Sequence, residues 1–180
     1  MIRIMTLLTS TLLALLATVH ITTQAGLAQS DTETTNLAVV QRFYEELSAG
    51  NTDVILAVHG DTLTMHYADS VEEVPTQLLA DDLAAFKAAN PDLRAVVHDL
   101  FAAGDLVIAN VTWTTTHTGD YFGIPATGRT SLHNGLVVRR LENGKIVESW
   151  EMFDDLAFLH SLGYVGSWEE ITAQPPTICR

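Results

Sequence analysis

The chain has 180 residues, and its nine Lys and Arg against 22 Asp and Glu give a formal net charge of −13. This length predicts one domain that can bury a core without disulfides or metals. The acidity argues against nucleic-acid binding, because phosphate backbones are also negative. Cys179 is the only cysteine, so the chain cannot form an internal disulfide.

The first 28 residues have the pattern of a secretory signal peptide. Arg3 precedes the uncharged stretch 4–21, and Gly26-Leu27-Ala28 offers small residues for cleavage before Gln29. A transmembrane anchor is the alternative, since the stretch is almost long enough to span a bilayer, but Thr, Ser and His interrupt it. We therefore expect a secreted or periplasmic protein, with no stable membrane insertion after cleavage.

The first half of the mature chain is predicted to be mainly helical. Residues 29–36 are polar and predict a short linker that ends in a helix cap at Asn36. Apolar periodicity then indicates a helix to about Ser48, with Tyr44 on its apolar face. The other elements expected in this half are a helix over 52–59, a strand over 63–67 and a helix over 75–90.

The second half is rich in Val, Ile, Thr and Trp, which favour strands. Gly104-Asp105 and Asn143-Gly144 are tight-turn signals between the strands. Helices first and an antiparallel meander afterwards indicate an α+β domain, and a curved sheet over helices leaves a cavity for a small hydrophobic molecule. The predicted strands cover 93–101, 106–116, 131–141 and 146–153.

Three spaced stretches carry a family resemblance. They are 116–129, 143–151, and 153–156 with the Leu162-Gly163 pair that follows. In this order and spacing they resemble the SnoaL-like polyketide cyclases, also labelled ester cyclases, of the NTF2-like superfamily. The resemblance covers 37–165 and leaves 166–180 as a tail. It implies an NTF2-like cone, in which a curved, mostly antiparallel sheet wraps over N-terminal helices.

The resemblance also implies an activity. SnoaL-like cyclases close a ring by an intramolecular aldol reaction that uses a carboxylic acid and no metal or cofactor, and Glu151 stands at the position of that acid. The implied substrate is a hydrophobic, polyketide-like carbonyl compound, acted on by a cyclase or isomerase. The chain departs from the usual pattern at Ser149-Trp150-Glu151, where His-Trp-Asp is typical, and at Pro125-Ala126, where two prolines are usual. A non-catalytic binder of a small apolar ligand is the alternative.

A two-residue turn at Asn143-Gly144 predicts a register for the last hairpin. In that register His133 opposes Asp154, on the face opposite Glu151. Glu151, Asp154 and His133 are the catalytic candidates. A β-bulge, for example at Asn134-Gly135, would be needed to bring them to one cavity. Glu151 is expected among the apolar side chains of Leu136, Val138 and Phe153, a setting that suits proton transfer. The alternative is a solvated glutamate paired with Arg140.

The remaining candidates are expected to line or cap the pocket. His117 precedes the loop 119–128, which is expected to close the cavity mouth, and a histidine bonded to the loop backbone is the alternative. For the aromatic residues, ordinary core packing is the alternative. The pocket candidates are Tyr44, Trp113, His117, Phe122, Asn134 and Phe153.

Two further expectations concern metals and partners. The seven His show no paired ligand spacing, so no metal site is expected. A homodimer is expected through one face of the sheet, on which Val137, Ile146 and Trp150 would lie together.

Overall fold

The computed structural model describes residues 29–67, 70–121 and 123–173. The predicted signal peptide, Phe122 and Cys179 lie outside the described residues. Within those three ranges, no helix is long and apolar enough to cross a membrane.

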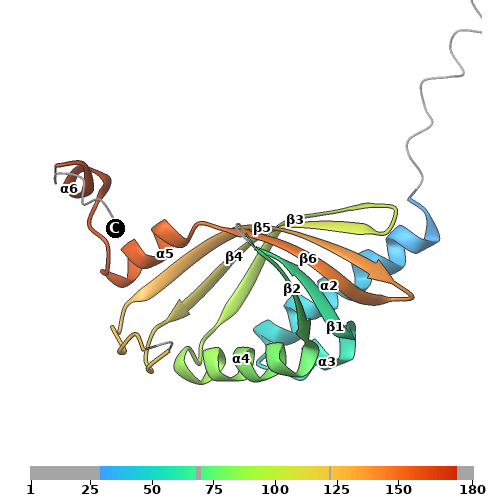
Figure 1. Ribbon diagram of the computed structural model, residues 1–180, viewed down its shortest axis with the longest axis horizontal. Coiled ribbons are helices and arrows are strands. Elements are labelled where there is room, and N and C mark those ends of the chain that lie inside the picture. The colour runs from blue at the N-terminus through green and yellow to red at the C-terminus, as the bar shows by residue number, and fades with distance from the viewer. Residues whose placement is uncertain (1–28, 68–69, 122, 174–180) are drawn as a thin grey trace, which may run out of the picture. The chain divides into compact units, whose positions relative to one another are not determined.

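A six-stranded sheet forms one layer of the fold (Figure 1). Its strand order is β2-β1-β6-β5-β4-β3, and all neighbouring pairs are antiparallel except β1 and β6, which are parallel. The predicted α+β class with a mostly antiparallel sheet is confirmed. The strands are β1 (His59–His66), β2 (Val71–Pro75), β3 (Arg94–Ala103), β4 (Leu106–Thr116), β5 (Thr130–Glu142) and β6 (Lys145–Phe153).

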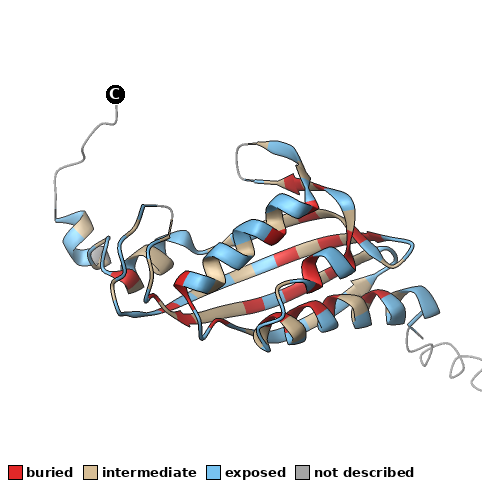
Figure 2. Ribbon diagram, turned by 90° about the horizontal axis from the view of Figure 1, so that it is seen from below, coloured by how far each residue is buried: buried red, intermediate tan, exposed pale blue. Residues whose placement is uncertain are grey.

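Three helices pack against one face of this sheet, which we call the inner face (Figures 1 and 2). They are α2 (Asp31–Ser48), α3 (Val54–Val58) and α4 (Thr76–Ala89). Alternate residues of β4 point inward, as the two-residue period of a strand requires. Val107, Ala109 and Val111 are all buried there, against the apolar side of α2. Two short helices, α5 (Asp155–Leu162) and α6 (Trp168–Thr172), follow β6.

Helix α2 begins at Asp31, inside the stretch that was predicted to be a linker. Acidic residues in the first turn favour a helix start because they complement its dipole. The start is also tied to the β3–β4 turn, since the Gly104 amide donates to Glu33 Oε1 at 2.9 Å. Asn36 is therefore not a cap: it is buried within the helix, and its amide donates to the Gly104 carbonyl at 3.4 Å.

The β5–β6 hairpin begins as predicted and then shifts by one residue. Asn143 and Gly144 have φ values of 51° and 74°, as a two-residue hairpin turn requires. Leu141 pairs with Ile146, but Arg140 pairs with Glu148. Val147 is thus an extra residue in β6, a β-bulge that reverses the direction of every later side chain on that strand.

The bulge overturns three predictions about faces. His133 lies on the same face as Val137 and Glu151, and not on the face opposite Glu151. Val137 pairs with Glu151, so Glu151 lies on the inner face, whereas Leu136 and Val138 lie on the outer face. The three residues predicted to form a dimer face do not lie on one face. Ile146 and Val137 are buried under the helices, while Trp150 stacks on His66 on the outer face with ring centroids 4.5 Å apart.

Candidate functional site

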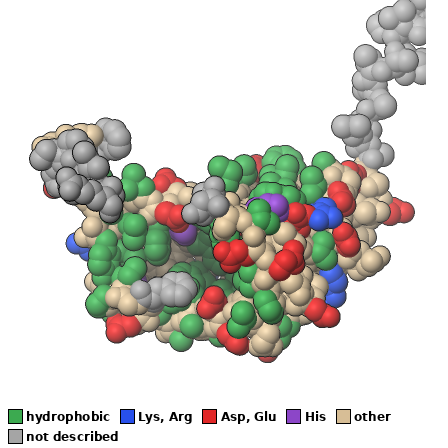
Figure 3. Space-filling model, in the orientation of Figure 1, with side chains coloured by type: hydrophobic (Ala, Val, Ile, Leu, Met, Phe, Trp, Pro, Cys, Tyr) green, Lys and Arg blue, Asp and Glu red, His purple; other side chains and the backbone are tan. Residues whose placement is uncertain are grey.

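Two adjoining hollows open beside the end of β6. Their volumes are about 660 Å³ and 430 Å³, and Glu151, Phe153 and Asp155 line both of them. The space-filling view shows a hollow surrounded largely by hydrophobic side chains (Figure 3). The larger hollow is also lined by Tyr67 and by the outer-face residues His66, Trp150 and Met152. The smaller one is also lined by Phe86, Trp113, Tyr121, His133 and Phe158.

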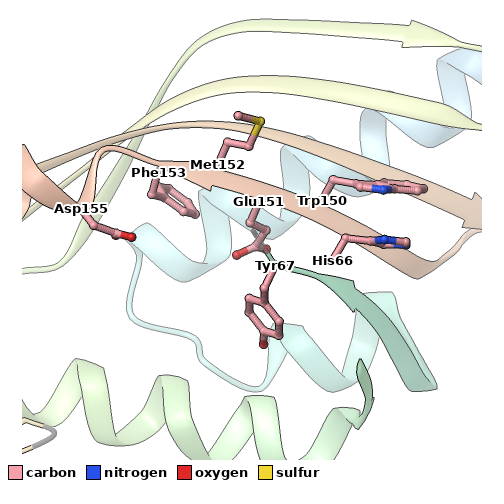
Figure 4. A pocket seen from close by; sticks show the side chains of 7 residues that line it. All are labelled: His66, Tyr67, Trp150, Glu151, Met152, Phe153 and Asp155. Carbon is pink, nitrogen blue, oxygen red and sulfur yellow. The ribbon is translucent and has the colours of Figure 1, made fainter. Parts of the chain in front are cut away.

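Glu151 is the carboxylate that reaches this space from the middle of the sheet. Its side chain and that of Phe153 project on the same side of β6 as Tyr67, and Met152 projects to the other side (Figure 4). Ser149 Oγ donates to Glu151 Oε1 at 3.2 Å. Arg139 Nη2 lies 3.6 Å from the same oxygen. No described residue bonds Oε2, so one oxygen of the carboxylate is anchored and the other is available.

Arg139 is a buried cation behind this carboxylate. Its side chain is only 5% exposed, against 26% for Glu151. The guanidinium carbon lies 4.7 Å from the centre of the Phe43 ring, close enough for a cation–π contact. Burial of a guanidinium is costly unless it is paired, so the contact with Glu151 compensates this charge.

His59 supports the guanidinium as a neutral acceptor. Its Nδ1 lies 2.9 Å from the Ile55 carbonyl oxygen, which can only accept, so Nδ1 carries the proton. Its Nε2 then accepts from Arg139 Nη1 at 3.3 Å. Burial, and secondarily the charge of Arg139, lower the pKa of His59 from 6.5 to about 3. His59 is therefore uncharged at neutral pH.

His133 also faces the hollow, but its partner is not the predicted one. Its Nε2 lies 2.9 Å from Asp155 Oδ1. Its ring stacks on that of Phe158 and is tilted against that of Phe153, with centroids 4.7 Å and 4.6 Å away. Asp154 instead caps helix α5 by accepting from the Ala157 amide at 2.9 Å. The predicted His133–Asp154 pair is wrong because the bulge in β6 moves the register by one residue.

The remaining candidates are divided between the hollow, the core and the outer face. Trp113 and Phe153 line the smaller hollow. Tyr44 is buried below it, with its ring centroid 6.1 Å from that of Trp113. Asn134 is on the outer face, where it accepts from Thr112 Oγ1 at 2.7 Å.

His117 belongs to the base of the loop that follows β4. It is buried, and its Nδ1 lies 3.3 Å from Thr127 Oγ1. Its backbone pairs with Arg129 and Gly128, which closes the loop 119–128 at its base. The histidine thus supports this loop, from which Tyr121 reaches the smaller hollow.

Glycine at position 135 lets Phe153 lie against the sheet. A Cβ built at Gly135 would be 2.3 Å from two carbons of the Phe153 ring, closer than any real contact. The ring can therefore cover the backbone of β5 only because residue 135 has no side chain. This close approach holds the Phe153 ring against β5, where it lines both hollows.

No group of three or more His, Cys, Asp and Glu within the described ranges could hold a metal ion. The chemistry that this site can perform with its own side chains is proton transfer, by the Glu151 carboxylate and by the imidazole of His133.

Comparison with known proteins gives the family. The family model of the SnoaL-like polyketide cyclases matches residues 38–162. The chain belongs to this family. The predicted resemblance is thus confirmed, while no curated protein matches the sequence.

Solved structures share the SnoaL-like fold. A protein from Jannaschia sp. CCS1 assigned to the SnoaL-like polyketide cyclases is 22% identical with a TM-score of 0.67, and the match covers 76% of this chain and 97% of that one. IdmH from Streptomyces antibioticus, assigned as a polyketide cyclase, is 25% identical with a TM-score of 0.58, covering 71% and 98%. An LEH-like epoxide hydrolase from M. tuberculosis is 16% identical with a TM-score of 0.59, covering 79% and 98%.

Two residues of the SnoaL-like site were missed in the sequence. Arg139 alternates with the apolar residues Val137 and Leu141, and all three are buried. A charged residue at an inward position of a strand is the signal that could have identified it. The sequence does not distinguish Asp155 from Asp154, because both are acidic and the bulge in β6 decides which of them reaches His133.

Proposed function

We propose that this SnoaL-like protein is an exported cyclase or isomerase that works without a cofactor on a hydrophobic carbonyl compound. The observation that carries the proposal is the Glu151 carboxylate, which lines an aromatic hollow with Oε1 anchored and Oε2 unbonded by any described residue. Membership of the SnoaL-like family supports a cyclase- or isomerase-like role.

The chemistry follows from the available oxygen. Glu151 Oε2 removes a proton from the carbon next to a substrate carbonyl, which leaves an enolate. In a cyclase the enolate carbon attacks a second carbonyl of the same molecule, and the new alkoxide takes up the proton that Glu151 removed, which restores the carboxylate. In an isomerase the proton returns to a different carbon. The aromatic walls from Trp113, Phe153 and Phe158 suit a flat hydrophobic substrate.

Replacement of Glu151 tests this role. Glu151→Gln keeps the shape of the side chain and removes its basicity, so we expect turnover to fall by about 100-fold or more. The assay is hydrogen–deuterium exchange next to the carbonyl of 2-tetralone, a bicyclic ketone, followed by NMR in D₂O. Glu148→Gln is the matched control, because Glu148 lies on the same strand but bonds Arg140 and His66 on the outer face.

Equal exchange by the wild type and by Glu151→Gln would exclude the role of this carboxylate. The alternative would then be favoured: a non-catalytic binder of a small apolar ligand. Ser149 in place of the usual histidine is the sequence feature that supports this second function.

Export rests on the pattern of residues 1–28. Because a signal peptidase cleaves after small residues, the mature protein is expected to begin at Gln29. N-terminal sequencing of the chain recovered from outside the cytoplasm checks this, and an intact Met1 in that fraction would contradict it.

A further inference from the structure

Arg139 is a buried charge with a single acidic partner among the described residues. Its guanidinium is covered on one side by the Phe43 ring, and its Nη2 lies 3.6 Å from Glu151 Oε1. It does not line either hollow, whereas Glu151 lines both. Arg139 therefore does not act through contact with the substrate.

The guanidinium is held in place from several elements. His59, at the start of β1, accepts from Nη1, and the Phe43 and Tyr44 rings of α2 lie 4.7 Å and 5.8 Å from the guanidinium carbon. Its Nε is buried, and none of the described residues forms a hydrogen bond with it. An arginine fixed in this way presents Nη2 to Glu151 in one orientation.

We propose that Arg139 is the positioning residue for Glu151: together with Ser149 it holds Oε1, so that Oε2 is directed into the hollow. This inference rests on the proposed function of Glu151. The phenols of Tyr44, on α2, and Tyr67, which follows β1, also face this carboxylate, and Asp155 and His133 line the smaller hollow with it. Among the described residues Arg139 is the cation that pairs with Glu151, so Arg139 supplies the charge that opposes it.

Kinetics of three variants test the proposal. Arg139→Met is expected to lower kcat for 2-tetralone exchange by about tenfold or more and to leave KM within about twofold, because Arg139 does not touch the substrate space. Arg139→Lys keeps the charge and is expected to recover part of kcat. Arg140→Met is the matched control, since Arg140 is the next residue of β5 and pairs with Glu148 and Glu142 on the outer face. An unchanged kcat in Arg139→Met would overturn the proposal.

A measurement that needs no substrate separates this proposal from the function on which it rests. Urea unfolding of Arg139→Met, Glu151→Gln and the double variant gives the coupling between the two residues, because each single change removes their interaction. We expect the double variant to lose clearly less stability than the sum of the single variants, whereas Arg139→Met with Glu148→Gln should be additive. Additivity in the first pair would overturn the positioning role, whatever the activity. Coupling without any effect of Glu151→Gln on exchange would overturn the proposed function alone.

Discussion

Lowering the pH from neutrality to about 4 is expected to reduce the free energy of unfolding by about 3 kcal/mol through His59 alone. The pKa of His59 is lowered from 6.5 to about 3 in the folded protein, first by burial and then by Arg139. Above pH 6.5 the histidine is neutral in both states and has no effect. As the pH falls from 6.5 toward 3 the unfolded chain takes up a proton that the folded chain refuses, so stability is progressively lost.

His59→Gln isolates this contribution. A glutamine amide can still accept from Arg139 near the position of Nε2 but does not titrate. The stability of the His59→Gln protein should therefore depend less on pH than that of the wild type. The measurement is urea unfolding at pH 7 and at pH 4 for the wild type, for His59→Gln and for His98→Gln, in which the lost histidine is exposed. The wild type and His98→Gln should lose about 3 kcal/mol more than His59→Gln between these values. Equal losses in all three proteins would show that His59 does not resist protonation.

The same titration affects the candidate site. Protonated His59 could no longer accept from Arg139, and it would place a second positive charge 3.3 Å from the guanidinium. The support of Glu151 by Arg139 is thus expected to fail together with the fold at acid pH. The residues that stabilise the core and the residues that orient the carboxylate are here the same.

Much of the fold was predictable because its signals are local. The Asn143-Gly144 turn, the apolar alternation of β4 and the helical period of α2 each depend on a few neighbouring residues. The start of α2 at Asp31 could not be predicted in this way, because Glu33 and Asn36 bond to Gly104, which lies far along the chain.

The bulge in β6 has no local signal in the sequence. Ile146-Val147-Glu148 has no glycine or proline to mark an irregularity, so an uninterrupted strand was expected. Yet Ile146 and Ser149 are both completely buried, although residues three apart on a regular strand face opposite sides. The parallel pairing of β6 with β1 favours this arrangement, since His59 pairs with Ile146 and Met65 with Ser149. Only tertiary contacts reveal the bulge. These contacts therefore decide which face of the sheet Glu151 occupies.

Tyr44 is the second residue whose replacement should have a large effect. Its side chain is 1% exposed, and its ring packs edge-on against Phe43, with centroids 5.0 Å apart, and against Trp113. Tyr44→Ala leaves a cavity where these rings meet, and we expect it to reduce the free energy of unfolding by about 3–5 kcal/mol. Thermal or urea unfolding at neutral pH measures the loss.

Tyr44→Phe is the matched control, because it keeps the ring and removes only the hydroxyl. Among the described residues that hydroxyl has no partner in hydrogen-bond geometry. Burial raises the pKa of Tyr44 by more than the nearby Arg139 guanidinium lowers it, so it is a neutral phenol. Removal of an unpaired buried polar group is nearly neutral or stabilising, so Tyr44→Phe should stay within about 1 kcal/mol of the wild type. A loss as large as that of Tyr44→Ala would mean that the hydroxyl, and not the ring, makes the important contact. The support of Trp113, and with it the wall of the hollow, would then depend on a hydrogen bond and not on aromatic packing.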